Sequence, residues 1–474
     1  MDVNADKNPF NEVQQRDARK LDTTRKSMLA TPSGECSASA LAAYCNGIGR
    51  VPAGAHRCAR RTLLDTLGVA AAGSMTQAGR ASLKAAGEIW GDGAAPVWFS
   101  KRRLPPVGSA FVNATYAAAL DLDDGHRQAS GHPAAAIVPA VLAVATSAGS
   151  SGNRLLSAIV LGYEIAVRIS AARDIRTIRT TDTGLWCGAG VAAACGWLTG
   201  QSTAVIAHAI AIAGQTATSQ AATGWTKLGH TVKEGIPWAT ANGLQAVALA
   251  AAGHRGPLDI LDEAALYDRQ RLVGNYSKSW AIEEAYFKLY SCCRWGHAAI
   301  DGALALAQRL QAGPNDIEGL LIETFERALT LPNQNEPRSA EAAQYSIPFC
   351  VALALVHGEK ALLPMDDAHL SDNRVTGLAG RIRLSSARDY AYSFPAGTPA
   401  RVTMTAKGKS ETIEVLYPRG EPQNPLTARE LREKFLKLSS ALSQEQRSDI
   451  AAMVNGLGIH QDPAALIEAL SGSS

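Results

Sequence analysis

The chain has few of the groups that mark a metal or redox centre. Its eight cysteines are scattered along 474 residues, and no two of them form a Cys-x-x-Cys pair. A zinc or iron–sulfur framework is therefore not expected, and no dinucleotide-binding fingerprint is present. Scattered cysteines in a long chain without a secretory signal are typical of reduced, cytoplasmic proteins. We expect a cytoplasmic protein with no metal and no organic cofactor.

The sequence also lacks an excess of charge and long apolar runs. Its 46 Lys and Arg nearly balance 43 Asp and Glu, for a formal net charge of +3. Surfaces that follow nucleic acid or anionic membranes need clustered Lys and Arg, so neither partner is expected. No uninterrupted apolar run is long enough to predict a membrane span. Residues 1–32 are polar and charged, and we expect a disordered N-terminal arm there.

Small and apolar residues are abundant instead. The chain is 46% hydrophobic, which is enough for more than one core. From about residue 37 to 256, Ala-, Gly- and Leu-rich stretches with helical spacing alternate with glycine-rich breaks. The stretches cover residues 40–48, 56–72, 108–120, 134–148, 154–170, 187–199 and 202–215. They predict an all-α bundle whose helices approach one another closely.

The pattern changes near residue 310, where strands are predicted over 317–331, 381–384, 400–405 and 411–416. The last two flank Lys407-Gly408-Lys409 and predict a β-hairpin. Thr427 to Glu430 has the form of a capping box and begins a last helical region that runs to about residue 470. The expected fold is mainly α: an all-α domain over 33–275, completed by helices over 425–470, with a smaller α+β domain over 276–424 inserted between them.

The first candidate site is the segment from Asp121 to His132, which places three carboxylates and two imidazoles between two apolar helical stretches. His132 stands near a helix start, where Pro133 suits the first turn. Such a helix N-terminus attracts anions and would suit a carboxylate substrate. Pro139 indicates that the helix either begins or kinks there. A capped, solvated loop would give the same pattern.

The second candidate runs from Phe287 to His297. It gathers an ammonium, a phenol, a guanidinium and an imidazole, those of Lys288, Tyr290, Arg294 and His297. An arginine can bind a carboxylate through two hydrogen bonds, and a lysine or histidine can move a proton. A half-buried junction with ordinary surface charges is the competing interpretation. Cys292 and Cys293 are expected to serve in packing.

The third candidate is the stretch from Lys227 to Gly235, which follows a small-residue helix and precedes the helix that begins at Trp238. Its glycines lack a Walker pattern and a preceding strand, so phosphate binding is not favoured. Lys233 could donate to a substrate carboxylate. A solvated linker fits the same residues equally well.

Taken in order, these segments resemble the MmgE/PrpD family of dehydratases, decarboxylases and epimerases. The matching blocks are Leu63 to Gly73, Asp121 to His132, Val232 through Gly256-Pro257, Lys288 to His297, and Ser346 to Phe349. Single blocks have little specificity, but five in the right order are specific, and the similarity covers most of residues 37–465. The resemblance implies a helical domain with a smaller lid domain, a homodimer, a site between the domains, and no metal or organic cofactor.

The family pattern maps onto Asp121, His132, Lys233 and Lys288, and the chain departs from it elsewhere. Trp186 stands where cis-aconitate decarboxylases carry a histidine, and Phe349 stands where they carry a tyrosine. Gly125 replaces the threonine or tyrosine of many relatives. The loss of a proton donor and a phenol disfavours decarboxylation. It leaves dehydration, isomerisation and epimerisation open.

The residue types suggest roles. His132 is expected to move a proton, Lys288 to hold a substrate carboxylate, and Asp121 to orient the imidazole or hold its charge. The residues expected to contact substrate are Lys233, Arg294, His297, Tyr290, Trp186, Phe349 and Gly125. The expected activity is that of a 2-methylcitrate dehydratase-like lyase, which removes a proton alpha to a carboxylate of a small di- or tricarboxylate.

Two alternatives stay open. One is an isomerase, an epimerase or a cis-aconitate decarboxylase-like enzyme on a similar substrate. The other is a catalytically silent, dimeric scaffold that only binds a carboxylate. A silent protein need not bring Asp121, His132, Lys233 and Lys288 into one pocket, so their arrangement in space separates the two classes.

Overall fold

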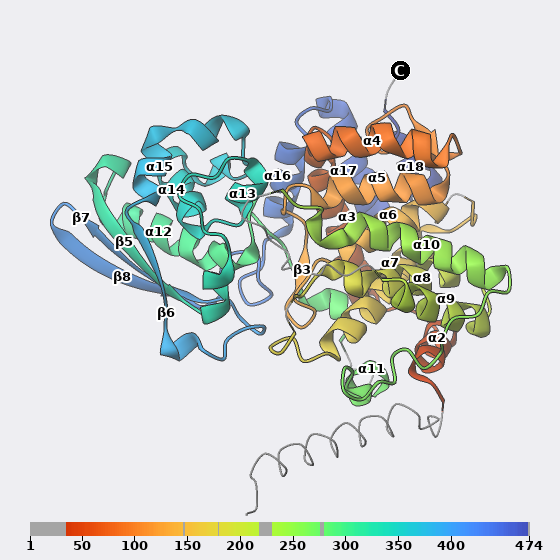
Figure 1. Cartoon of the computed structure of the whole chain (residues 1–474). Helices are drawn as coiled ribbons and strands as arrows, with labels where there is room; N and C mark the ends of the chain where they lie inside the picture. The colour runs from red at the N-terminus through yellow and green to blue at the C-terminus, as the bar shows by residue number, and fades with distance from the viewer. Residues whose placement is uncertain (1–34, 146, 179, 218–229, 275–278, 473–474) are drawn as a thin grey trace, which may run out of the picture.

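The computed structural model describes residues 35–145, 147–178, 180–217, 230–274 and 279–472. They form two lobes side by side, a larger one of helices and a smaller one of a sheet with helices (Figure 1). Helices dominate, which confirms the prediction of a mainly α fold. The arm predicted over residues 1–32 lies outside the described residues.

The larger lobe gathers helices from both ends of the described chain (Figure 1). Its helices are α2 (Ser37–Gly47), α3 (Ala53–Gly73), α4 (Gln77–Trp90), α5 (Pro106–Ala118), α6 (Ala134–Ala145), α7 (Gly152–Ala171), α8 (Cys187–Leu198), α9 (Thr203–Gln215), α10 (Ile236–Ala251), α11 (Arg269–Val273), α16 (Ala428–Leu438), α17 (Gln444–Gly456) and α18 (Pro463–Ala469). Each helical stretch predicted between residues 40 and 215 is one of them. Helix α4 was missed because it buries only Gly79 and Ala86. None of the helices in the described ranges has both the length and the apolar character needed to cross a bilayer.

Small residues allow close packing at the centre of this lobe. Every residue of α6 is buried, and the helix begins at Ala134 and continues through Pro139. Between α7 and α8, a Cβ on Gly190 would lie 2.6 Å from the Ala166 Cβ and 2.6 Å from the Gly162 carbonyl oxygen. Only glycine fits there. The close approach of α7 and α8 therefore requires small residues such as Ala and Gly.

The smaller lobe is built on a four-stranded sheet. Its strands are β5 (Ile317–Thr324), β6 (Ile382–Ser386), β7 (Ala400–Ala406) and β8 (Lys409–Val415), in the order β6-β5-β7-β8. β6 is parallel to β5, and the other pairs are antiparallel. The helices of the lobe are α12 (His297–Arg309), α13 (Ala340–Gln344), α14 (Ile347–His357) and α15 (Asn373–Ala379). Inward residues of β5 and β7 share one core with α12 and α14.

The predicted strands occur, with one correction. β7 and β8 pair as a hairpin across Lys407 and Gly408, whose φ values of 53° and 70° suit a tight hairpin turn. The strand predicted over 317–331 is wrong beyond Thr324, because residues Glu326–Thr330 form a 3-10 helix. The apolar residues Phe325, Ala328 and Leu331 recur every third position and are all buried. This spacing matches the period of a 3-10 helix rather than that of a strand.

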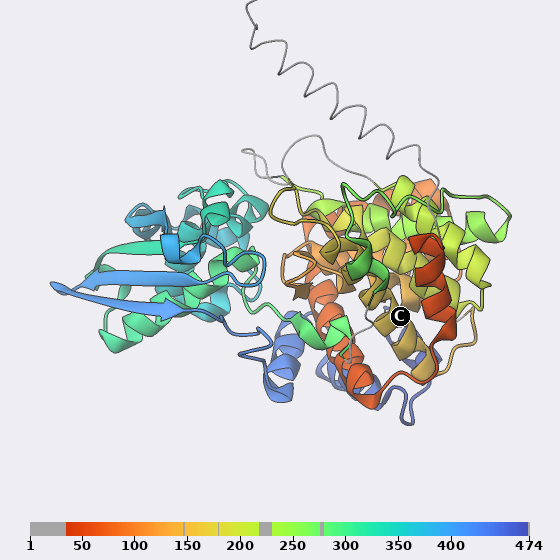
Figure 2. The same cartoon turned by 90° about the horizontal axis from the view of Figure 1, so that it is seen from below.

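Helix α16 brings the chain back to the larger lobe, as both views show (Figure 2). It begins with the predicted capping box, in which Thr427 and Glu430 each accept from the other's backbone N–H. It lies so close to α3 that a Cβ on Gly68 would be 3.1 Å from the Phe435 Cα.

One buried side chain of α16 reaches the segment that follows α5. Lys434 donates to Asp65 Oδ1 on α3 at 2.6 Å and to the carbonyl oxygen of Leu122 at 2.9 Å. Leu122 directly follows Asp121, the first residue of the first candidate segment. Helix α16 therefore helps to position that segment.

Candidate active site

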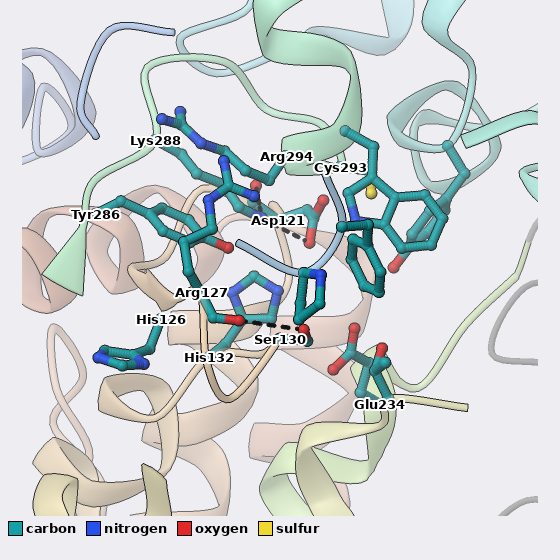
Figure 3. A pocket seen from close by; sticks show the side chains of 15 residues that line it. Asp121, His126, Arg127, Ser130, His132, Glu234, Tyr286, Lys288, Cys293 and Arg294 are labelled. Carbon is teal, nitrogen blue, oxygen red and sulfur yellow. Dashed lines mark hydrogen bonds and ion pairs between the residues drawn. The ribbon is translucent and has the colours of Figure 1, made fainter. Parts of the chain in front are cut away.

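A pocket lies where the two lobes meet, and side chains from both lobes line it (Figure 3). The first candidate segment forms one wall, and the second candidate segment forms another. The lining residues are Asp121, His126, Arg127, Ser130, His132, Thr181, Glu234, Tyr286, Lys288, Cys293, Arg294, Trp295, Tyr345, Phe394 and Pro395. Asp121, His132 and Lys288, predicted from distant parts of the sequence, thus share one cavity.

A short antiparallel ladder joins the two segments. Strand β3 (Gly125–His126) pairs with β4 (Ala285–Tyr286), with Gly125 opposite Tyr286. Beyond β4, the Nζ of Lys288 lies 3.1 Å from Asp121 Oδ1 and 3.0 Å from the Asp121 carbonyl oxygen. The ladder therefore brings the two charged groups together.

Asp121 and Lys288 form a buried ion pair. Burial acts to raise the pKa of Asp121, but the charges of Lys288 and Lys233 outweigh it and lower the pKa to about 2. Burial acts to lower the pKa of Lys288, and the Asp121 carboxylate reverses this and raises it. Both groups are therefore charged at neutral pH. Asp121 has a φ of 52°, a left-handed conformation of the kind that clusters at functional sites.

His132 precedes α6 and has a defined tautomer. Its Nδ1 lies 2.6 Å from the carbonyl oxygen of Asp124. A carbonyl oxygen only accepts, so Nδ1 carries the proton and Nε2 carries the lone pair. No hydrogen bond to Nε2 comes from the described residues. Burial lowers the pKa of His132, so at neutral pH the ring is neutral, as a general base must be.

The group that orients the imidazole differs from the expected one. Asp121 pairs with Lys288, while the Asp124 carbonyl and the Asp123 carboxylate, whose Oδ2 is 3.6 Å away, face Nδ1 of His132. Burial raises the pKa of Asp123 to about 7. Asp121 is still near enough for its charge to favour the protonated imidazole.

This segment is capped but not solvated. Asp124 Oδ1 accepts from the backbone N–H of Ala134 at 3.1 Å, and its Oδ2 accepts from the Tyr163 hydroxyl at 2.8 Å. Burial raises the pKa of Asp124 to about 8. Asp121, Asp124 and His132 are all exposed by 9% or less. The interpretation as a solvated loop is therefore wrong for these residues.

The turn before α10 supports His132 from the other side. Lys233, Glu234 and Gly235 are all left-handed, with φ values of 49°, 55° and 71°. Glu234 Oε2 accepts from Thr183 N at 2.9 Å and from Thr183 Oγ1 at 2.6 Å. Thr183 Oγ1 in turn accepts from the backbone N–H of His132 at 3.1 Å. Residues 227–229 of this candidate lie outside the described residues.

Two arginines share one carboxylate at the pocket wall. Arg127 Nε donates to Glu421 Oε2 at 3.1 Å, and Arg294 donates to Glu421 Oε1 through Nε at 2.9 Å and Nη2 at 2.7 Å. Burial acts to raise the pKa of Glu421, but the two guanidinium charges outweigh it and lower it. Two positive charges against one negative charge leave a net positive wall, which suits an anionic ligand.

Of the seven expected substrate contacts, Arg294 lines the pocket and six do not. The Nζ of Lys233 donates to Gln344 Oε1. The Tyr290 hydroxyl donates to Asp301 at 2.6 Å, and His297 Nδ1 lies 2.9 Å from Arg294 Nη1. Trp186 lies in the core of the larger lobe, and Phe349 lies in the core of the smaller lobe. Gly125 lies against the ring of Tyr286.

Several lining residues were not predicted. Tyr286 precedes Lys288 by two positions, and Glu234 directly follows Lys233. This closeness to predicted residues is the only feature of the sequence that could have indicated them. Trp295 lies inside the second candidate segment but was not singled out. Tyr345 and Phe394 come from elsewhere in the smaller lobe, and no sequence pattern marked them.

In the part of the chain that the structure describes, no cluster of three His, Cys, Asp or Glu side chains could hold a metal ion. Cys293 lines the pocket, and burial raises the pKa of its thiol. A protonated thiol is a poor nucleophile, which agrees with a packing role.

The fold and the site define the class of protein. It is a two-lobed, mainly helical protein with a buried, charged pocket between its lobes. Residues 39–275 match the MmgE/PrpD N-terminal domain, and residues 290–457 match the MmgE/PrpD C-terminal domain. The chain belongs to the MmgE/PrpD family. The resemblance inferred from the sequence blocks is confirmed.

Several relatives are similar over nearly their whole length. The chain is 25% identical to the cis-aconitate decarboxylase-like protein oryM of Aspergillus oryzae, over 94% of this chain and 98% of that protein. It is 24% identical to a cis-aconitate decarboxylase of Aspergillus terreus, over 89% and 92% of the two chains. It is 26% identical to the cis-aconitate decarboxylase of Homo sapiens, over 88% and 90%. A cis-aconitate decarboxylase is a lyase, and at this identity these relatives support a lyase-like function at the level of the family.

Proposed function

We propose that this protein is a cofactor-independent lyase, of the 2-methylcitrate dehydratase-like type, that removes a proton alpha to a carboxylate of a small di- or tricarboxylate. The observation that carries the proposal is the meeting of three groups in one buried pocket. These groups are the neutral imidazole of His132, the Asp121–Lys288 ion pair and the arginine pair at Glu421. Family membership and the decarboxylase names of the relatives support the reaction class.

His132 is the base in this proposal. Its Nε2 lone pair takes the proton from the α-carbon, and the C–H electron pair moves into the adjacent carboxylate as an enediolate. The imidazolium that results lies near Glu234 and Asp121, whose charges favour it. The enediolate then returns its electron pair to form a carbon–carbon double bond as the C–O bond of the neighbouring carbon breaks, and the hydroxyl takes the proton from the imidazolium and leaves as water. Lys288 and the arginines offset the charge that grows on the substrate, and such preplaced charges act strongly in a buried site.

The charge balance of the pocket favours a substrate with more than one carboxylate. Lys288 is already balanced by Asp121, whereas Arg127 and Arg294 share the single carboxylate of Glu421. We place one substrate carboxylate at the arginine wall and the reacting one near Lys288. Aromatic side chains of the smaller lobe complete the lining and favour a small substrate.

Decarboxylation is the second candidate, because the relatives carry that name. Trp186 and Phe349 stand against it, since neither supplies the imidazole or phenol that the resemblance assigns to decarboxylases. Isomerisation or epimerisation would follow from the same proton abstraction if the proton returned elsewhere on the substrate. A silent carboxylate-binding scaffold is the alternative of another class. The convergence of Asp121, His132 and Lys288 in one pocket disfavours it, whereas Lys233, the fourth residue of that criterion, does not line the pocket.

We further propose that the smaller lobe, residues 276–424, acts as a lid on the helical domain formed by residues 33–275 and 425–470. The lining of the pocket by both lobes supports this. A cytoplasmic homodimer formed through the helical domain completes the proposal.

The test is incubation of the protein with a panel of di- and tricarboxylates in deuterium oxide, followed by proton NMR. We expect one compound to lose its α-proton signal and a product with a new double bond to accumulate. A product with one carboxylate fewer would favour decarboxylation. Binding without exchange or conversion of any compound would favour the silent scaffold.

A further inference from the structure

Tyr286 is a buried tyrosine that the roles proposed above do not use. It lines the pocket and is 4% exposed. Figure 3 shows its hydroxyl turned toward the space bordered by Asp121, Arg127 and His132. The hydroxyls of Tyr163 and Tyr290 donate to carboxylates, whereas that of Tyr286 has no hydrogen bond among the described residues. Buried phenols usually find a partner, so a bound molecule is a natural acceptor.

Gly125 makes room for this ring. It lies opposite Tyr286 in the β3–β4 ladder. A Cβ at Gly125 would lie 2.2 Å from Tyr286 Oη and 2.3 Å from Cζ. Gly125 is not among the residues with positive φ, so glycine is needed here for space and not for backbone conformation. Any larger residue at this position would push the phenol out of its place.

The surroundings of Tyr286 suit a hydrogen-bond donor. Burial raises the pKa of Tyr286 to about 12, so the phenol keeps its proton at neutral pH. The guanidinium carbons of Arg127 and Arg294 lie 5.0 and 4.8 Å from the ring centroid. Positive charge near a phenol makes its hydroxyl a stronger donor, because it stabilises the electron-rich oxygen.

We propose that Tyr286 is a catalytic residue of the reaction proposed above, on which this inference rests. Its hydroxyl donates a hydrogen bond to the reacting carboxylate as that group takes up the charge of the enediolate. The proton leaves the α-carbon for His132, the electron pair enters the carboxylate, and the phenol keeps its own proton. A hydrogen bond to a growing charge is stronger in the transition state than in the ground state, and this difference lowers the barrier.

The experiment measures α-proton exchange in deuterium oxide for wild type and Tyr286→Phe, on the compound that the panel identifies. We expect the variant to lower kcat by roughly 10²-fold, the cost of removing one such donor. KM should change little, because the lost contact tightens only in the transition state. Tyr390→Phe is the matched control. It removes a phenol hydroxyl that donates to Glu414 in the sheet, outside the pocket lining, and exchange should stay at the wild-type rate.

A second variant tests the geometry and does not depend on the folding of Tyr286→Phe. Gly125→Ala should displace the phenol and lower kcat to a similar extent. In a Tyr286→Ala background, which removes the ring, the same Gly125→Ala change should have little further effect. Full additivity of the two losses would contradict the proposed link between the two residues.

The outcomes separate the two proposals. If the wild type exchanges the α-proton and Tyr286→Phe exchanges it at the same rate, the proposed role of Tyr286 is wrong and the proposed function is unaffected. A wild-type protein that exchanges no compound of the panel overturns both. A loss confined to KM overturns the catalytic role as well, because it would mark Tyr286 as a contact of equal strength in ground and transition states.

Discussion

Two neighbouring groups hold His132 from two sides. The Asp124 carbonyl oxygen binds its Nδ1, and Thr183, itself held by Glu234, binds its backbone N–H. Neither contact occupies Nε2, so the side chain is positioned while its lone pair stays available. A group held this way loses little freedom when substrate arrives.

His132→Asn should lower turnover by roughly two to four orders of magnitude, the usual contribution of a general base. Asparagine can still donate to the Asp124 carbonyl, so the melting temperature should change little. Turnover and melting temperature are measured together on the purified variant. A folded variant with turnover close to that of wild type would contradict the assignment.

The pH dependence follows from the same residue. Burial lowers the pKa of His132, so kcat/KM should fall on the acid side with a midpoint below the roughly 6.5 of an ordinary histidine. The folded protein binds this proton less readily than the unfolded chain does. The contribution of His132 to stability is therefore complete above its pKa in the unfolded chain. It is lost as the pH falls through its pKa in the folded protein. An acid limb centred above that ordinary value would contradict the prediction.

Sequence reasoning found the residues whose chemistry is distinctive. Asp121, His132 and Lys288 stood out as an acid, an imidazole and an ammonium in two unusual segments, and they share the pocket. Glu421 and Tyr286 did not stand out, because their position depends on pairings between distant segments. Which carboxylate meets which cation depends on backbone turns, such as the left-handed Asp121, that residue type does not reveal.

At the scale of elements, periodicity predicted the buried helices and the hairpin, because burial of one face imposes a regular spacing. Helix α6 shows the limit of single-residue rules. Pro139 lies inside it without ending it, since the buried apolar environment on all sides stabilises the helix more than the lost hydrogen bond weakens it. Helix α4 shows another limit, because the two residues that it buries, Gly79 and Ala86, have little or no side chain.

The link between α16 and α3 allows a quantitative test. Lys434→Met leaves the Asp65 carboxylate buried without its partner, and losing one partner of a buried ion pair costs roughly 3–5 kcal/mol. We expect the free energy of unfolding, measured in urea, to fall by about that amount. Adding Asp65→Leu should recover most of the loss, because two apolar residues leave no uncompensated charge. A single variant as stable as wild type would contradict this account.

For the whole molecule, the proposed dimer has a candidate surface on α10. Trp238 and Leu249 are 45% and 46% exposed and, eleven positions apart, lie on one face of the helix. We expect light scattering to give twice the chain mass of 49.7 kDa for wild type. Trp238→Glu should shift the mass toward that of one chain, because a charge is costly in an apolar interface. A monomeric wild type at micromolar concentration would contradict the proposal.

Chelation tests the cofactor prediction for the molecule as a whole. The spacing of Cys and His offers no metal motif, so protein treated with a chelator should retain full turnover. Loss of turnover that one added metal restores would contradict it.

The contact between Lys434 and the Leu122 carbonyl spans 312 positions of the chain. A ribosome synthesises the segment that carries Asp121 and His132 long before it synthesises the helix that supports this segment. Until α16 leaves the ribosomal exit tunnel, Asp65 has no ammonium partner and the segment lacks one of its supports. A chain that is released before α16 is synthesised should therefore carry Asp121 and His132 without the contacts that Lys434 supplies. In the cell, activity would begin only after the message has been translated through α16.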